Sequence, residues 1–215
     1  GHITAAVQAA ESLRLEKLLL IPDRIAPHKQ IPAGSPSPEQ RLKMLQIAAE
    51  GKSKMEVSDM ELRRQGKSYT YETVLELKKH CPDDELVLLM GTDMFLSFES
   101  WKNPDIILDQ ASLAVLYRGE KGENQQILEK KRYWESKGYT VELVENQIVP
   151  ISSTQLRRMI LFRCADDYLP NGVLEYILKH GLYGTDKQYR QLPMEELEPV
   201  VTGLLDPKRV SHVLG

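Results

Sequence analysis

Short apolar runs alternate with longer amphipathic segments along the first two thirds of the chain. Runs 86–90 and 111–117 contain few polar residues, which is typical of strands covered on both faces of a parallel sheet. The expected strands fall at residues 17–21, 55–59, 86–90, 111–117 and 140–144. The expected helices fall at residues 3–15, 38–50, 123–137, 173–180, from 152–154 to about 162, and between a cap at 68–70 and a stop at 81–82. This order predicts an α/β fold with a doubly wound parallel sheet.

Composition and charge narrow the classes of function. The 215 residues carry 28 basic and 31 acidic side chains, a net charge of −3, so no bulk basic surface is expected to bind nucleic acid or an anionic membrane. No apolar run reaches the roughly 18 residues that span a bilayer, and no secretory leader opens the chain. Cys81 and Cys164 form no metal-type pair, and we expect buried or idle thiols in a reducing cytoplasm.

The loop at residues 23–38 follows the first expected strand, at the edge where a doubly wound sheet binds ligands. It contains Pro27, His28 and Lys29, and an imidazole beside an ammonium can receive a carboxylate or a phosphate. A solvated polar turn is the alternative reading of these residues.

Gly91, Thr92 and Asp93 follow the most apolar expected strand. A glycine there lets a ligand approach the backbone, and a carboxylate can bind ribose hydroxyls or a magnesium ion. An N-cap made by Thr92 or Asp93 explains the same residues. Trp101 stands near Phe95 and Phe98, so it is either a core residue or a platform that stacks on a flat ring.

Residues 151–157 provide the sharpest local pattern. Hydroxyls at 152–154 precede a helix that carries Arg157, and this donor set fits pyrophosphate or triphosphate oxygens. A well-capped helix with a surface arginine is the alternative. Gly1 and His2 open another expected helix, whose amino end favours an anion; a tag remnant or an exposed cap is the alternative there.

Strand ends converge at one edge of this fold, so these groups are expected to lie together. They include phosphate receptors but no triad, no nucleophilic cysteine and no pair of acidic bases. The set therefore favours nucleotidyl transfer by positioning and charge stabilisation over hydrolysis through a covalent intermediate.

Together, the motifs resemble bacterial nicotinate-nucleotide adenylyltransferases of the HxGH nucleotidyltransferase superfamily. The resemblance covers about residues 1–184 and rests on residues 21–22, 26–29, 68–70, 91–94, Trp101, 151–157 and 180–183. It implies adenylyl transfer from ATP to nicotinate mononucleotide, which gives deamido-NAD and pyrophosphate, with Mg²⁺ offsetting the triphosphate charge. Ala26 stands where the family usually has a proline.

The resemblance also implies residue roles. His2 and Arg157 would be catalytic, and no protein metal ligands are expected. The implied ATP contacts are Gly1, His2, Gly91, Asp93, Ser153, Thr154 and Arg157, and the implied nicotinate mononucleotide contacts are His28, Lys29, Tyr69, Thr70 and Trp101.

The two ends of the chain depart from the family pattern. Gly1-His2 matches only the second half of the opening G-G-T-F-D-P-x-H-x-G-H, so we expect a sheet without its first strand and impaired activity. Residues 1–184 are expected to form the nucleotidyltransferase domain, and residues 185–215 a linker and the first helix of an HD-type phosphohydrolase, with His212 as its first metal ligand.

Alternative functions involve the same groups. One is an HxGH adenylyltransferase that uses nicotinamide mononucleotide or phosphopantetheine, and another is a nucleotide-binding fragment without catalysis. The implied partners are ATP and nicotinate mononucleotide, without nucleic acid or membrane; a homo-oligomer is left open.

Overall fold

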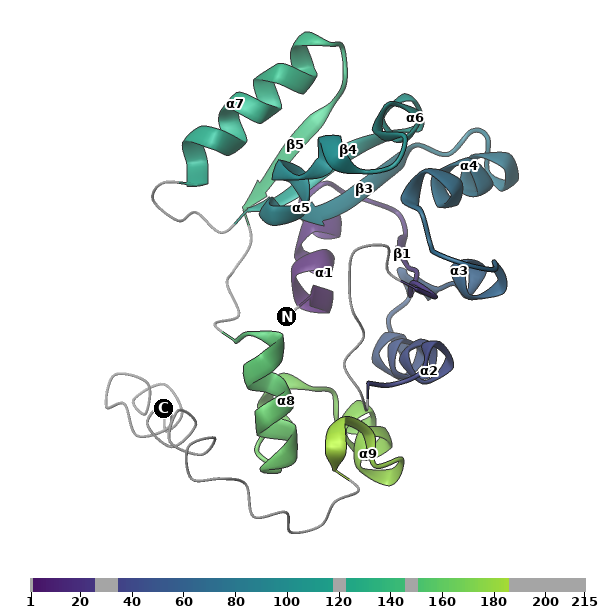
Figure 1. Cartoon of the computed structure of the whole chain (residues 1–215), viewed down its shortest axis with the longest axis vertical. Helices are drawn as coiled ribbons and strands as arrows, with labels where there is room; N and C mark the ends of the chain where they lie inside the picture. The colour runs from purple at the N-terminus through teal and green to yellow at the C-terminus, as the bar shows by residue number, and fades with distance from the viewer. Residues whose placement is uncertain (1, 26–34, 118–122, 146–150, 186–215) are drawn as a thin grey trace. The chain divides into compact units, whose positions relative to one another are not determined.

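The computed structural model describes residues 2–25, 35–117, 123–145 and 151–185. They belong to two compact units, one formed by residues 1–31 and 37–149 and the other by residues 32–36 and 150–215 (Figure 1). This division falls inside the segment expected to form the nucleotidyltransferase domain. The expected boundary at residue 184 stays a prediction, because residues 186–215, including His212, lie outside the described part.

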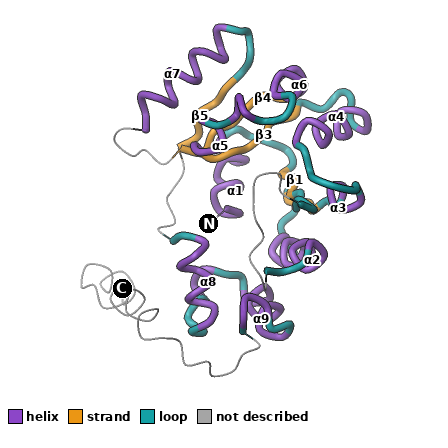
Figure 2. The backbone as a smooth tube through the Cα atoms, viewed as in Figure 1, coloured by secondary structure: helices purple, strands orange, loops and turns teal. Residues whose placement is uncertain are grey.

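All five expected strands are present in the first unit, shifted by no more than two residues at either end. Their bounds are β1 Leu18–Leu20, β2 Met55–Val57, β3 Leu86–Gly91, β4 Ala111–Tyr117 and β5 Val141–Glu145. The strands pair in parallel, β1 with β2 and β4 with both β3 and β5. Strands are orange in Figure 2. The expectation of an α/β fold with parallel strands is confirmed.

The described strands form two sheets, where the sequence led us to expect one. Their orders are β1-β2 and β3-β4-β5, and no described strand pairs with both β1 and β3. The link between the sheets is instead the helix α1 (His2–Ser12). Ala10 of this helix packs with Leu18 and Met55 of the smaller sheet, whereas Ala9 packs with Ala114 of the larger one.

Helices cover both faces of the three-stranded sheet. Leu113 and Val115 of β4 point into the main core, whereas Ala114 between them contacts α1 on the opposite face, as the alternation of side chains along a strand requires. The main core is completed by helices α4 (Thr70–His80), α5 (Thr92–Leu96), α6 (Pro104–Gln110) and α7 (Glu123–Ser136) (Figure 1).

Helix α2 (Pro38–Ala49) begins as its sequence predicts. Ser37 and Gln40 form a reciprocal capping box, with Pro38 in the first turn, and these contacts satisfy amides that a helix start leaves free. The helix ends at Ala49 with Glu50 as its C-cap, and Gly51 follows with φ +76°. The short elements α3 (Met60–Arg63), η1 (Phe98–Ser100) and α6 (Pro104–Gln110) were not expected, whereas a helix at the position of α5 (Thr92–Leu96) was one of the alternatives.

The described part of the second unit is helical. It contains α8 (Ser153–Leu161), η2 (Asp166–Tyr168), α9 (Asn171–Lys179) and η3 (Leu182–Gly184). Both long helices were expected, and Gly181 follows α9 with φ +60°, which is consistent with its expected role as a stop.

The two cysteines are free thiols. Cys81, just past the end of α4, is exposed, and Cys164 is half-buried. Of the two expected alternatives, buried or idle thiols, burial therefore does not apply to Cys81. None of the described helices is long and apolar enough to cross a membrane.

Candidate active site

The carboxyl end of β3 carries the first group of candidate residues. Gly91 is exposed, and a Cβ added there would meet no atom within 4 Å. Thr92 is buried, and Asp93 is exposed in the first turn of α5. Gly91 itself occupies the N-cap position, and no side chain caps this helix. The alternative that Thr92 or Asp93 forms an N-cap is therefore wrong, and this cap does not use the Asp93 carboxylate.

The start of α4 carries the second group. The expected cap formed by residues 68–70 is wrong, because Tyr69 is the N-cap residue and makes no side-chain cap hydrogen bond. The buried Ser68 hydroxyl instead accepts a 2.9 Å hydrogen bond from the Arg24 backbone N–H. The Ser68 N–H in turn donates to the Ile25 carbonyl at 3.1 Å. Two hydrogen bonds thus join the residue before Tyr69 to residues 24–25.

Residues 23–25 are held by further contacts. The Arg41 guanidinium of α2 donates to the Asp23 carboxylate at 2.5 Å and to the Asp23 carbonyl at 2.7 Å. The Arg24 guanidinium donates to the Leu62 carbonyl at 2.7 Å. The candidates His28 and Lys29 lie outside the described residues, but the chain enters their segment from this fixed point.

Trp101 stands between η1 (Phe98–Ser100) and α6. Its ring centroid lies 5.2 Å from that of Phe98, and the side chain is half-buried against the main core. Part of the indole thus packs in the core, as one of the two expected roles requires, while the rest of the side chain is accessible to solvent.

Lys102 connects the start of α4 with the segment that carries Trp101. Its Nζ lies 4.2 Å from the Tyr69 ring centroid and 5.7 Å from that of Tyr71. Tyr69 at the start of α4 is therefore next to the segment that carries Trp101. The sequence analysis did not single out Lys102; its position directly after Trp101 was the available signal.

An ion-pair network supports the first turns of α4. The Arg64 guanidinium lies 3.8 Å from Glu61, 3.5 Å from Glu72 and 3.5 Å from Glu76. Thr73 donates a 2.5 Å hydrogen bond to the buried Glu61 carboxylate. These contacts fix α4 against α3 and so help to position Tyr69 and Thr70.

Tyr71 lies beside this network. Its hydroxyl donates a 2.8 Å hydrogen bond to Glu72, and this bond, with some desolvation, raises the pKa of Tyr71. The Tyr71 phenol is therefore neutral near pH 7 and hydrogen-bonded to Glu72. Lys102 is the charged side chain that lies over the rings of Tyr69 and Tyr71.

The triphosphate candidates lie in the second unit. Ser152 forms a capping box at the start of α8, since its hydroxyl accepts from the Gln155 N–H at 3.1 Å and its own N–H donates to the Gln155 side chain at 2.9 Å. Ser153 and Thr154 are exposed, and their hydroxyls bond to no described residue. The Arg157 guanidinium lies 5.9 Å from the Tyr183 ring centroid. The cap alternative is thus correct for Ser152 and leaves the next two hydroxyls accessible.

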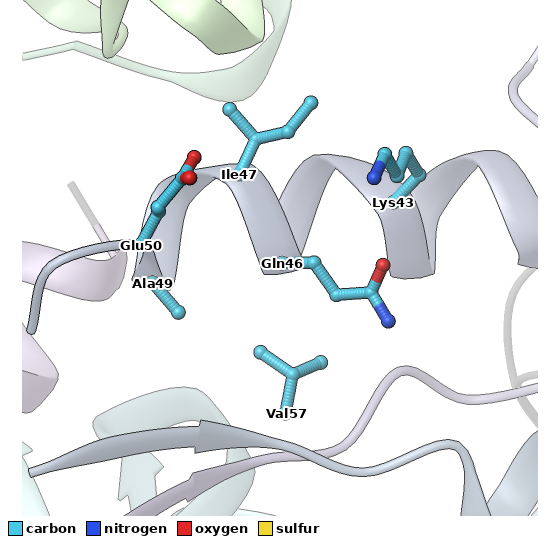
Figure 3. Close-up of a pocket in the computed structure, with 6 residues that line it drawn as sticks. All are labelled: Lys43, Gln46, Ile47, Ala49, Glu50 and Val57. Atoms are coloured by element: carbon cyan, nitrogen blue, oxygen red, sulfur yellow. The ribbon is translucent and has the colours of Figure 1, made fainter.

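Two further observations concern His2 and a pocket that lies apart from the candidate residues. His2 is the first residue of α1, while its side chain and Gly1 are outside the described part of the chain. A shallow pocket lies between α2 and β2, lined by Lys43, Gln46, Ile47, Ala49, Glu50 and Val57 (Figure 3). It contains none of the candidate residues.

These features fit a nucleotide-binding α/β protein of the nucleotidyltransferase class: parallel strands alternate with helices, an exposed glycine ends the apolar strand β3, and a carboxylate follows in the first turn of α5. Residues 1–159 match the family described as cytidylyltransferase-like. A probable nicotinate-nucleotide adenylyltransferase of Lachnoclostridium phytofermentans is 31% identical over 183 residues, which cover 85% of this chain and 91% of that protein. The chain belongs to the nicotinate-nucleotide adenylyltransferase family.

Other similarities agree with this assignment. A probable nicotinate-nucleotide adenylyltransferase of Borreliella afzelii is 34% identical over 184 residues, 85% of this chain and 89% of that protein. The fold is similar to that of the Plasmodium falciparum nicotinic acid mononucleotide adenylyltransferase complexed with NaAD, with a TM-score of 0.68, 17% identity, and coverage of 87% of this chain and 92% of that one. At 17% identity, the similarity to the Plasmodium falciparum structure shows the fold alone.

Proposed function

We propose that this chain transfers the adenylyl group of ATP to nicotinate mononucleotide. The 5′-phosphate oxygen of the mononucleotide attacks the α-phosphorus of ATP, the bond from that phosphorus to the bridging oxygen breaks, and deamido-NAD and pyrophosphate form. The observation that carries the proposal is the family relationship, at 31% identity over 85% of the chain. The aromatic surface formed by Tyr69 and the Trp101 segment supports a flat acceptor ring.

The proposed ATP contacts are those that the family resemblance implies, at the end of β3 in the first unit and, separately, at the start of α8 in the second. Gly91 leaves room for the nucleotide to approach the backbone, and Asp93 accepts hydrogen bonds from ribose hydroxyls. The exposed hydroxyls of Ser153 and Thr154 and the Arg157 guanidinium bind the β- and γ-phosphates. The remaining proposed ATP contacts are Gly1 and His2.

The proposed acceptor site uses the start of α4. Trp101 offers its accessible part to the pyridine ring, Tyr69 and Thr70 shape the site, and His28 and Lys29 bind anionic groups of the mononucleotide. The hydrogen bonds between Ser68 and residues 24–25 support this assignment, because they tie the entrance of the His28 segment to Tyr69.

In the proposed mechanism the protein forms no covalent intermediate. His2 and Arg157 stabilise the negative charge that moves from the α-phosphate to pyrophosphate, and the two substrates are held in line. Mg²⁺ would offset charge on the triphosphate when bound. The described residues contain no group of three or more His, Cys, Asp or Glu side chains arranged for a metal, so phosphate oxygens would provide most of its ligands.

The free thiols support a reducing cytoplasm as the compartment.

A direct test compares acceptors. The protein is incubated with ATP and nicotinate mononucleotide, nicotinamide mononucleotide or phosphopantetheine, and pyrophosphate release and the nucleotide product are measured. We expect deamido-NAD and a higher kcat/KM for the acid. A clear preference for the amide or for phosphopantetheine overturns the proposal, and ATP binding by calorimetry without turnover supports the non-catalytic alternative.

A further inference from the structure

We propose that Lys102 is a specificity-determining residue, whose ammonium binds the carboxylate on the pyridine ring of the acceptor and so favours the acid over the amide. This inference deepens the proposed function and rests on it for the identity of the acceptor. Lys102 is absent from the set of residues that the family resemblance implies.

The position of Lys102 is the first argument. Its Nζ lies 4.2 Å from the centroid of the Tyr69 ring, and its backbone directly follows Trp101, which is packed on Phe98 at 5.2 Å. The ammonium thus lies over Tyr69, one of the two aromatic residues proposed for the acceptor, and the other, Trp101, is its neighbour in the chain. A ring bound against these residues would carry its substituents within reach of a flexible four-carbon side chain.

The charge of Lys102 is the second argument. Lys102 is exposed, and in the described part of the chain no carboxylate lies within ion-pair distance of it. Glu72 at the start of α4 is already engaged, by the Arg64 guanidinium at 3.5 Å and by the Tyr71 hydroxyl at 2.8 Å. In the described part of the chain, Lys102 contacts the rings of Tyr69 and Tyr71 and the Tyr71 side chain, and a carboxylate is a stronger partner for an ammonium.

The chemistry of the acceptor is the third argument. Nicotinate carries a carboxylate at neutral pH, whereas nicotinamide carries a neutral amide on the same ring. An ammonium forms a hydrogen-bonded ion pair with the carboxylate, whereas it can donate only to the neutral carbonyl oxygen of the amide. A single lysine therefore changes the ratio of the two affinities, which is what specificity measures.

A purely structural role is the competing explanation. Lys102 would then only join the start of α4 to the Trp101 segment by packing on Tyr69, and its loss would weaken both acceptors alike. The variants Lys102→Met and Lys102→Arg separate the explanations, because methionine keeps much of the apolar packing without the charge and arginine keeps the charge.

The experiment measures kcat/KM for both mononucleotides and the KM for ATP. For Lys102→Met we expect a fall of about 10- to 100-fold with the acid, the value of one hydrogen bond between charged groups, and a clearly smaller fall with the amide, below about tenfold, because no ion pair is lost there. Lys102→Arg should retain most of the preference. Lys137→Met is the matched control, because Lys137 also lies over a tyrosine ring, at 4.4 Å from Tyr133, and no candidate site residue is involved.

Binding measured by calorimetry separates this inference from the proposed function. If the wild-type protein binds both mononucleotides without turnover, the catalytic proposal fails, and the ratio of the two dissociation constants in Lys102→Met still decides the role of Lys102. Equal losses for the acid and the amide, or an unchanged ratio, overturn the inference. Binding of neither mononucleotide overturns both proposals.

Discussion

The backbone N–H of Arg24 donates a 2.9 Å hydrogen bond to the hydroxyl of Ser68, 44 residues further along the chain. The Ser68 N–H donates back to the Ile25 carbonyl at 3.1 Å. Two hydrogen bonds therefore hold Ser68, the residue before Tyr69, against residues 24–25, which precede His28 in the chain.

Substitution of Ser68 tests this connection. Ser68→Ala leaves the Arg24 N–H without its partner at a buried position, so we expect a loss of about 1 to 3 kcal/mol in the free energy of unfolding. The KM for nicotinate mononucleotide should rise more than the KM for ATP. Urea unfolding and initial rates measure these effects, with Ser136→Ala as a control at an exposed serine. Equal rises in both KM values would contradict the assigned positioning role.

Arg64 and its neighbour Arg63 provide a second test. Arg64 contacts three carboxylates and its side chain is 23% exposed, whereas Arg63 pairs with Asp59 at 3.2 Å and is 68% exposed. Arg64→Met should cost about 2 to 4 kcal/mol, because it leaves the buried Glu61 carboxylate without its ion pair. Arg63→Met should cost less than about 1 kcal/mol. Similar melting temperatures for the two variants would show that the network around Arg64 does not stabilise α4.

Gly91 and Gly138 form a matched pair. A Cβ at either position meets open space, but Gly138 has φ +90° and Gly91 does not have a positive φ. Gly91→Ala should leave stability unchanged and raise the KM for ATP by roughly five- to tenfold. This corresponds to a loss of about 1 kcal/mol in binding free energy, because the added methyl group keeps ATP further from the backbone.

Gly138→Ala should show the opposite pattern, a loss of about 1 kcal/mol in stability from backbone strain with normal kinetics. Thermal unfolding and ATP titrations of both variants measure the contrast. A normal KM for ATP in Gly91→Ala would remove Gly91 from the proposed ATP site.

The hydroxyls at the start of α8 should separate into structural and binding groups. Ser152→Ala removes a helix cap, so we expect it to destabilise α8 by about 1 kcal/mol. Thr154→Ala removes no described hydrogen bond and should change stability by less than about 0.5 kcal/mol, while weakening the binding of ATP. Calorimetric titration with ATP and with AMP provides the readout, since only ATP carries the β- and γ-phosphates. An equal loss for both nucleotides in Thr154→Ala would argue against a contact with these phosphates.

The two cysteines should differ in reactivity with pH. Desolvation, helped by the negative charge of Asp166, raises the pKa of the Cys164 thiol, so less reactive thiolate is present there at pH 8. The exposed Cys81 should be alkylated first by iodoacetamide, and the rate at Cys164 should keep rising as the pH is raised further, because more of its thiol ionises. Mass spectrometry follows each site, with Cys81→Ser and Cys164→Ser identifying the fast and slow phases. Equal rates at pH 8 would contradict the assigned effect of burial.

The strands and the long helices could be predicted from the sequence because their patterns are local. The runs that became β3 and β4 are almost entirely apolar, and the Ser152 cap depends on a residue three positions away. Helices α3 and α6 were missed, since segments of 4 and 7 residues are too short for a helical period to stand out.

The site was harder to predict where contacts join distant parts of the chain. The sequence suggested a cap for Ser68, but the Arg24 amide takes its hydroxyl, and no local pattern contains that information. Lys102 was not singled out in the sequence, and its position over Tyr69 is known only from the fold. Trp101 could be read as core or as a stacking platform, and its half-buried position is compatible with both.

Helix α1 has a consequence for the proposed chemistry. Its neighbouring residues Ala9 and Ala10 touch different sheets, and its first residue is His2. A larger side chain at either alanine would tilt the helix, change the angle between the sheets and displace the histidine in a single movement. Mutations deep in this helix, far from any substrate, are therefore expected to behave in kinetic assays as if they had altered both binding sites at once.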